Sequence, residues 1–288
     1  MSLHEIKPKV RRLFWIAAYP KSGSTWLRFF VAHLTAQETI GESLRDAALR
    51  VPVDFGQAGF DRALGIKLAD LTTTEALALK PRRLEAEAQQ RLTPALYLTH
   101  DAWTASPLGE PLLPAAVTAG AIHLVRDPRD IAVSYAEFFN CSLDQAIAQM
   151  ADPAHIMIFN PEADSGPQLP LTLLDWSGHC RSWLAADGFP RLRLRYEDLL
   201  TNPQREFAKL ARFAHLPSTI DALERAITAT RFDRLKSQDA QEAYAYRGDG
   251  RSFFREGRSG GWRTALSSDQ ARQIERDHGP MMVHLGYL

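Results

Sequence analysis

The chain has 288 residues, 45% of them hydrophobic, and its 34 lysines and arginines balance its 34 aspartates and glutamates. That balance argues against a protein that coats nucleic acid, so any anion site must be a local concentration of charge. The length could divide into two domains, but one large α/β domain also reaches this size, and we expect a single domain over 1–288.

Cysteine content and hydropathy indicate the compartment. Cys141 and Cys180 match no metal-ligand spacing and form no disulfide framework, so we expect reduced thiols and no metal site. No apolar run approaches the roughly 18 residues of a membrane-spanning helix. Basic residues precede the first apolar run, but the run is brief, and we interpret it as a strand instead of a signal peptide. These features predict a cytoplasmic protein with no membrane partner.

The first predicted element is a strand over 13–18 that leads through a short loop into a helix. The loop consists of Tyr19, Pro20, Lys21, Ser22, Gly23, Ser24, Thr25 and Trp26. Apolar residues from Trp26 onward share one helical face, which places the helix N-terminus at the loop. The loop amides and the positive end of the helix dipole favour an anion, and Lys21 adds a full charge. The hydroxyls of Ser24 and Thr25 can donate to phosphate-like oxygens.

This loop differs from a Walker A loop, in which a lysine and a magnesium-binding hydroxyl follow the last glycine. Here Lys21 precedes the single glycine, Gly23, and the loop is shorter. A nucleotide kinase or another P-loop phosphotransferase is therefore the weaker alternative. The simplest alternative for this segment is an ordinary strand-to-helix turn with a surface lysine.

Three further apolar runs predict strands, at Ala95–His100, Ala121–Arg126 and Leu192–Tyr196. Helix-like sequence follows each run, and this alternation predicts a three-layer α/β fold with a central parallel sheet flanked by helices. Ligands of such sheets bind beyond the carboxyl ends of the strands. We therefore expect the polar residues at these ends to meet at one rim. They are Lys21, His100, Arg126 and Tyr196.

Three stretches rich in proline and glycine, 41–70, 101–118 and 151–170, are candidate lids and acceptor-binding loops. Aromatic residues outside the predicted strands indicate an apolar-walled pocket for a small alcohol or phenol, or else ordinary core. They are Trp103, Phe138, Phe139, Phe159, Tyr244 and Tyr246.

A second candidate anion site begins where the third strand ends. Asp127 fits a helix N-cap and Pro128 fits the first helical position, so a helix should start there. Arg126 ends the strand and Ser134 lies about two turns into the helix, so both can face the crevice of the first loop. The alternative is a helix cap whose arginine only pairs with nearby carboxylates.

These segments resemble the cytosolic-type sulfotransferases that use 3′-phosphoadenosine-5′-phosphosulfate (PAPS). The loop at 19–26 matches that family's Tyr-Pro-Lys-Ser-Gly-Thr-Thr-Trp except for Ser24. Arg126 and Ser134 resemble the arginine and serine, eight positions apart, that hold the 3′-phosphate. The resemblance runs in order from Arg12 to Trp262 and implies two anion holders for the two charged ends of PAPS, whereas an ATP enzyme would not need the second holder.

A third similar segment lies near the C-terminus, where Arg255, Glu256 and Gly257 resemble the family's Arg-Lys-Gly loop over the 3′-phosphate. Glu256 stands where the family has lysine, and Arg258 could supply the missing charge. A mobile surface loop rich in glycine and arginine is the alternative.

The resemblance also implies an adenine site. Thr230-Arg231-Phe232 is similar to the family's Thr-Ser-Phe, whose ring stacks on the base. By this likeness Trp26 and Phe232 sandwich adenine, and Thr230 and Tyr196 form hydrogen bonds near it. Aromatic residues of either kind are otherwise usual in a core.

The catalytic assignments follow from the same resemblance. His100 follows Thr99 as in the family's Lys-Thr-His, in which histidine is the base, and a histidine suits that role because its pKa lies near working pH. Leu98 stands where the family has lysine. Lys21 would stabilise the bridging oxygen, and Ser134 would restrain Lys21 until the acceptor arrives. No metal is expected in this scheme.

The sequence therefore predicts a sulfotransferase that moves the sulfuryl group of PAPS to a hydroxyl of a small molecule and releases a sulfate ester and 3′-phosphoadenosine-5′-phosphate (PAP). A non-catalytic PAP- or PAPS-binding protein is a further alternative. Carbohydrates and protein tyrosines are alternative acceptors that the sequence does not rule out. The oligomeric state is also open, because the family's dimer motif is not recognisable after Trp262.

Overall fold

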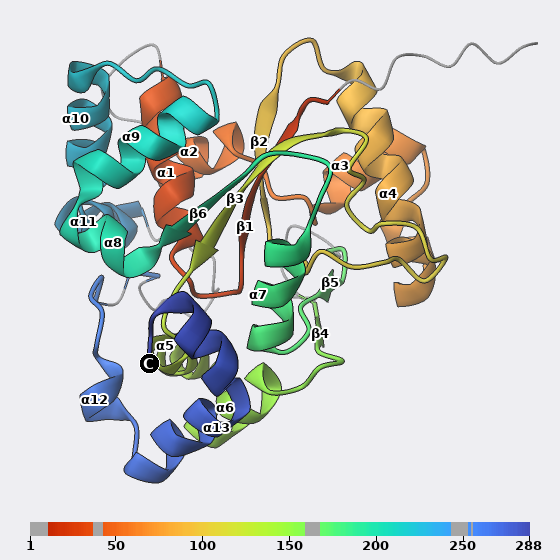
Figure 1. Cartoon of the computed structure of the whole chain (residues 1–288). Helices are drawn as coiled ribbons and strands as arrows, with labels where there is room; N and C mark the ends of the chain where they lie inside the picture. Colours follow the sequence, from red (N-terminus) through yellow and green to blue (C-terminus); the bar gives the residue numbers. More distant parts are fainter. Residues whose placement is uncertain (1–10, 37–42, 159–167, 243–252, 255) are drawn as a thin grey trace, which may run out of the picture.

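The computed structural model describes residues 11–36, 43–158, 168–242, 253–254 and 256–288. Its centre is a parallel sheet of four strands in the order β2-β1-β3-β6 (Figure 1). These are β1 (Leu13–Ala18), β2 (Ala95–Thr99), β3 (Thr118–Val125) and β6 (Arg191–Arg195). The predicted parallel sheet is confirmed, and each predicted strand lies within a few residues of its observed position.

Strand β1 lies between two neighbours, and all six of its residues are buried. A strand covered on both faces is a continuous apolar run, which is why the pattern of 13–18 identified it. Ala17 pairs with Thr99 of β2, and Ala18 pairs with Leu124 of β3. This register brings the carboxyl ends of the three strands to one edge of the sheet.

The helices of the described residues are α1 (Ser24–Thr35), α2 (Leu44–Arg50), α3 (Gln57–Leu64), the 3₁₀ turn η1 (Leu68–Asp70), α4 (Thr73–Gln90), α5 (Pro128–Phe139), α6 (Leu143–Met150), α7 (Trp176–Ala185), α8 (Tyr196–Thr201), α9 (Pro203–Phe213), α10 (Ile220–Ala229), α11 (Phe232–Glu242), α12 (Trp262–Ala265) and α13 (Ser268–Leu285).

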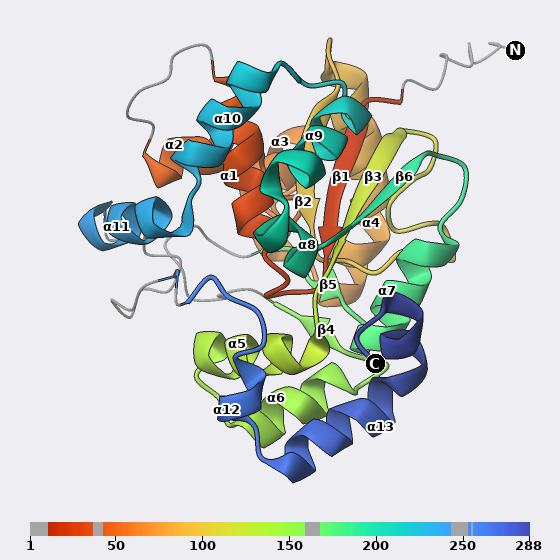
Figure 2. The same cartoon turned by 60° about the vertical axis from the view of Figure 1, so that its left-hand side comes forward.

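Helices cover both faces of the sheet, as the three-layer prediction requires (Figures 1 and 2). On one face, Ile16 and Ile122 pack in a cluster with apolar residues of α1, α9 and α10. On the other face, Trp15 and Ala121 pack with residues of α4 and α7, among them Trp183. Alternate residues of a strand thus belong to different layers.

A separate group of helices, α5, α6 and α13, lies beyond the carboxyl edge of the sheet (Figure 2). Arg129 of α5 joins this group to the end of the chain. Its guanidinium pairs with Asp127 at 2.8 Å and with Glu275 of α13 at 2.7 Å, and it donates to the carbonyl of Tyr287 at 2.9 Å. The end of the chain is therefore fixed next to the edge of the sheet where ligands are expected.

The stretches predicted as lids contain more regular structure than their composition indicated. The described part of 41–70 holds α2, α3 and η1, and Ser43 caps α2 by accepting from the amide of Asp46. The described part of 151–170 begins a short antiparallel ribbon, in which β4 (Ile156–Met157) pairs with β5 (Leu171–Thr172). Among the helices described, none has the length and apolar character needed to cross a membrane.

Candidate active site

A cavity that is partly open to solvent lies beyond the carboxyl ends of the four strands, with about 150 Å³ of space for the centres of water-sized molecules. The predicted site residues that line it are Lys21, Gly23, Ser24, Thr25, Trp26, His100, Arg126, Ser134, Tyr196, Thr230, Phe232, Glu256 and Gly257. Arg255 lies outside the described residues. Ser22 is buried behind the loop and does not line the cavity.

The loop between β1 and α1 presents the helix N-terminus to this cavity. Gly23 has a φ of 98°, and a Cβ atom there would lie 2.5 Å from the ring of Tyr196. Only glycine fits both constraints. Lys21 also has a positive φ, 70°, which is uncommon for a residue with a side chain. The first turn of α1 contains no acidic residue, so its amides keep their affinity for an anion.

Two aromatic rings surround the Lys21 ammonium. Its Nζ lies 3.7 Å from the ring centre of Phe138 and 4.7 Å from that of Phe253. Both rings line the cavity, so the lysine is at the boundary between the anion-binding loop and an apolar wall. Such cation–π contacts hold the ammonium in position.

Arg126 connects the loop between β1 and α1 to the segment 256–262, which we call the last loop. Its guanidinium donates to the carbonyl of Lys21 at 2.9 Å and to the carbonyl of Arg258 at 3.2 Å. It also lies over the ring of Tyr196, 4.4 Å from the ring centre. The second predicted anion holder therefore also fixes the backbone of the first. Its partner in the prediction, Ser134, lines the same cavity from α5.

Helix α5 begins where the sequence predicted. Asp127 is its N-cap, accepting from the amide of Arg129 at 2.9 Å, and Pro128 occupies the first helical position. Asp130, one turn in, reaches the last loop. Its carboxylate accepts from the amides of Gly260 at 2.7 Å and Trp262 at 3.0 Å. The sequence analysis did not identify Asp130, because the contact spans about 130 residues.

The last loop is also held by close contacts. A Cβ atom on Gly257 would lie 2.1 Å from the Phe232 ring, so only glycine allows this approach. Arg258 pairs with Glu256, its Nε lying 2.6 Å from the carboxylate. The glutamate that replaces the family's lysine is thus partly neutralised by the arginine that was expected to compensate for it.

Both aromatic residues of the predicted adenine platform line the cavity. Trp26 packs edge-on against Phe207 at 5.2 Å and Tyr196 at 6.1 Å between ring centres. Phe232 lines the cavity from the first turn of α11. The hydroxyl of Thr230 donates to the carbonyl of Ala226 at 2.8 Å, so toward a ligand it can only accept.

His100 is held in one tautomer. Its Nδ1 lies 2.6 Å from the carbonyl oxygen of Ala18, and because a carbonyl only accepts, Nδ1 carries the proton and Nε2 the lone pair. Burial, with a smaller contribution from the positive charges of Lys21 and Arg28, lowers the pKa of His100 to about 4, although this hydrogen bond and the charge of Asp54 act in the opposite direction. The imidazole is therefore neutral near pH 7 and can accept a proton at Nε2.

Apolar side chains line the rest of the cavity, and the sequence analysis found few of them. They are Phe55, Leu98, Phe138, Leu200, Leu235, Phe253 and Phe254. Of the predicted acceptor aromatics, Phe138 is in this wall. Trp103 packs instead on Trp183 and Phe189, and Phe139 packs on Tyr135, so both are partly buried against hydrophobic core clusters. Phe159, Tyr244 and Tyr246 lie outside the described residues.

Sequence comparison matches residues 11–286 to the family described as the sulfotransferase domain. The chain is 25% identical to sulfotransferase 1A1 of Canis lupus familiaris over 280 residues, covering 94% of this chain and 83% of the relative. It is 28% identical to sulfotransferase 1E1 of Cavia porcellus over 225 residues, which cover 77% of this chain and 65% of that enzyme.

Solved structures share the fold. A retinol dehydratase in complex with androsterone and inactive cofactor PAP superposes with a TM-score of 0.61 at 20% identity, covering 96% of this chain and 81% of that one. Mouse sulfotransferase SULT7A1 complexed with PAP gives a TM-score of 0.59 at 16% identity, covering 96% and 87%. At these identities the likeness concerns the architecture.

Proposed function

The chain belongs to the sulfotransferase domain family, and from this premise we propose that it transfers the sulfuryl group of PAPS to a hydroxyl group of a small-molecule acceptor. The observation that carries the proposal is that both predicted anion holders line a single cavity. One is Lys21 with the N-terminus of α1, and the other is Arg126 with Ser134. His100 lines the same cavity as a neutral imidazole.

The donor substrate is held by its charged ends and its base. The amides around Gly23, the hydroxyls of Ser24 and Thr25, and the Lys21 ammonium bind the 5′ phosphosulfate. Arg126 and Ser134 bind the 3′-phosphate, and Glu256 and Gly257 line the same cavity. Trp26 and Phe232 enclose the adenine ring.

The transfer exchanges one sulfur–oxygen bond for another. The acceptor oxygen forms a bond to sulfur as the bond from sulfur to the 5′-phosphate oxygen breaks, and PAP leaves. The acceptor's proton passes to Nε2 of His100, whose Nδ1–H stays bonded to Ala18. Lys21 stabilises the negative charge that grows on the bridging oxygen. Ser134 restrains Lys21 until the acceptor is present.

The acceptor binds on the side of the cavity next to His100. Phe55, Leu98 and Phe138 line the cavity, and the ring of Phe55 stacks 6.1 Å from that of His100 between ring centres. Leu98 is uncharged where the family has lysine. An apolar alcohol or a phenol buries its carbon skeleton against such apolar side chains and presents its hydroxyl to the histidine. A carbohydrate or a peptide tyrosine would leave polar groups against these side chains.

The test is PAP release from PAPS in the presence of a panel of phenols, apolar alcohols, sugars and tyrosine peptides. We expect turnover with phenols or apolar alcohols, and none with ATP and magnesium in place of PAPS. His100→Ala should bind PAPS but lose turnover. Tight binding of ATP without binding of PAPS or PAP would contradict the proposal, and PAPS binding without turnover on any acceptor would indicate a binding protein.

Two further parts of the proposal concern the whole chain. We expect it to act as one domain, since α13 and the last residues pack on α5 beside the cavity. The cytoplasmic location stays a prediction, which fractionation of cells that express the full chain would test.

A further inference from the structure

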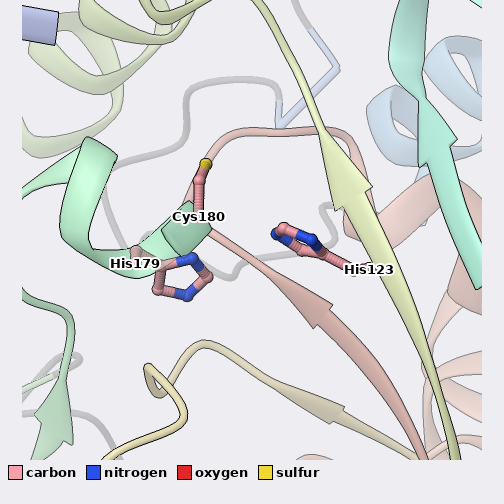
Figure 3. A group of neighbouring side chains, drawn as sticks. All are labelled: His123, His179 and Cys180. Atoms are coloured by element: carbon pink, nitrogen blue, oxygen red, sulfur yellow. The ribbon is translucent and has the colours of Figure 1, made fainter. Parts of the chain in front are cut away.

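Three side chains that could bind a metal ion meet behind the active site. His123 projects from β3, and His179 and Cys180 project from α7 (Figure 3). One potential ligand atom from each lies within 4.8 Å of the other two. His123 and His179 are 56 residues apart, so no local spacing in the sequence pointed to this group.

The group is buried and its hydrogen-bonding capacity is not met. The exposed fractions of His123, His179 and Cys180 are 3%, 0% and 1%. Within the part of the chain that the structure describes, neither ring nitrogen of His123 has a hydrogen-bond partner, nor has Nδ1 of His179. A buried polar atom without a partner is costly, and three of them in one group indicate a missing partner.

The second nitrogen of His179 is already oriented for metal binding. Its Nε2 lies 3.2 Å from the carbonyl oxygen of His100, so Nε2 carries the proton and Nδ1 carries a lone pair. Histidines that bind metals commonly donate their other N–H to a backbone carbonyl in this way, which fixes the tautomer and the ring orientation.

The chemistry of the three groups favours a metal ion that binds both nitrogen and sulfur ligands. His123 and His179 each offer an imidazole nitrogen, and Cys180 offers a thiol whose proton passes to solvent when the metal–sulfur bond forms. Two imidazoles and one thiolate suit Zn²⁺, whereas Mg²⁺ and Ca²⁺ require oxygen ligands.

We propose that His123, His179 and Cys180 bind one Zn²⁺ ion that joins β3 to α7 directly behind the catalytic histidine. Bond lengths of about 2.0–2.1 Å to nitrogen and about 2.3 Å to sulfur require ligand atoms closer together than the 4.8 Å within which they lie, so the three side chains must rotate toward one another as the ion binds. A water molecule takes the fourth position. The role is structural, and it does not depend on the sulfotransferase reaction.

Cobalt(II) is the probe that tests the ligand set. The full-length protein is stripped with a chelator, dialysed and titrated with Co²⁺ and then with competing Zn²⁺. We expect one equivalent per chain, the ligand-field bands of a tetrahedral ion and a thiolate charge-transfer band. Cys180→Ser should remove the charge-transfer band. It should also weaken Zn²⁺ binding by more than the roughly 10–100-fold that loss of an outer partner costs.

Two controls keep the result specific. Cys141→Ser alters the other free cysteine and should leave the spectrum and the stoichiometry unchanged. His123→Phe removes a ligand from the other element and should weaken binding to a similar degree as Cys180→Ser, with circular dichroism used to confirm that both variants fold. Absence of saturable Co²⁺ and Zn²⁺ binding by the wild-type protein, or equal binding by Cys180→Ser, would overturn the proposal.

Discussion

The chemistry of His100 is set by its immediate neighbours. The carbonyl of Ala18 fixes the tautomer, and burial together with the nearby cations keeps the ring neutral. The cations include Lys21, whose charge a bound donor would offset. The pKa of His100 should therefore be low in the free enzyme and higher once the anionic donor is bound.

This difference predicts a specific pH profile. A base works when it is deprotonated. The value of kcat/KM for PAPS reports the free enzyme, so it should stay level as the pH falls from 7 to about 5 and should decline as the pH passes through about 4. The acid limb of kcat should lie at higher pH, because the donor's negative charge raises the pKa of His100 in the complex. Initial rates over pH 4–8, with circular dichroism at each pH to confirm folding, measure both limbs. An acid limb of kcat/KM at or above about pH 6.5, the usual histidine value, would contradict the assignment.

Arg126 supports a second prediction at this scale. Its guanidinium contacts two carbonyls and an aromatic face at once, which a lysine ammonium cannot reproduce. Arg126→Lys should therefore weaken PAP binding almost as much as Arg126→Ala, by about 2–4 kcal/mol measured by calorimetry. Recovery of wild-type affinity by the lysine variant would show that charge alone is required.

Among the elements, α5 organises the site. Arg126 directly precedes this helix and Ser134 lies within it, and both line the cavity. Asp130 of the same helix holds the backbone of 260–262. Ordering a loop when a ligand binds costs free energy, and contacts that already hold the loop reduce this cost. Asp130 is therefore a positioning residue for the donor.

The corresponding prediction concerns donor affinity. Asp130→Ala removes three hydrogen bonds from the last loop, one from the Ser259 hydroxyl and two from backbone amides, and should raise KM for PAPS by about tenfold, equivalent to ~1.4 kcal/mol, with a smaller effect on kcat. Asp187→Ala, in an exposed turn, is the matched control. Steady-state kinetics at saturating acceptor separate the two parameters. A tenfold loss in kcat with no change in KM would instead indicate that Asp130 acts in the chemical step.

The elements differ in how far the sequence predicted them. The core strands and the start of α5 were predictable, because buried parallel strands are apolar runs and Asp127-Pro128 is a local helix signal. Helices α2 and α3 were not, since Pro and Gly nearby obscured short helices. Residues brought together only by tertiary contacts, such as Asp130 with the last loop, leave no local pattern. The same holds for His123 and Cys180.

At the scale of the whole molecule, a buried charge cluster joins several layers next to the active site. Lys80 of α4 pairs with Asp54 at 2.8 Å and with Asp101, and the three side chains are fully buried. Asp101 also accepts from the amide of Thr172 at 2.8 Å, and its carbonyl accepts from the indole of Trp183 at 2.9 Å. Burial disfavours the charged amine, but the two carboxylates more than offset this and raise the pKa of Lys80.

The last prediction concerns this cluster. Lys80→Met preserves much of the side-chain volume but leaves two carboxylates buried without their cation, so the free energy of unfolding should fall by about 3–5 kcal/mol. Lys67→Met, which alters an exposed lysine before η1, should change it by less than about 0.5 kcal/mol. Adding Asp101→Asn to Lys80→Met should recover part of the loss, because one buried charge is removed while the amide oxygen still accepts from Thr172. Urea unfolding followed by circular dichroism measures all three variants. A loss below about 1 kcal/mol for Lys80→Met would mean that water or a proton compensates for the missing ammonium, and the cluster would then not hold the layers together.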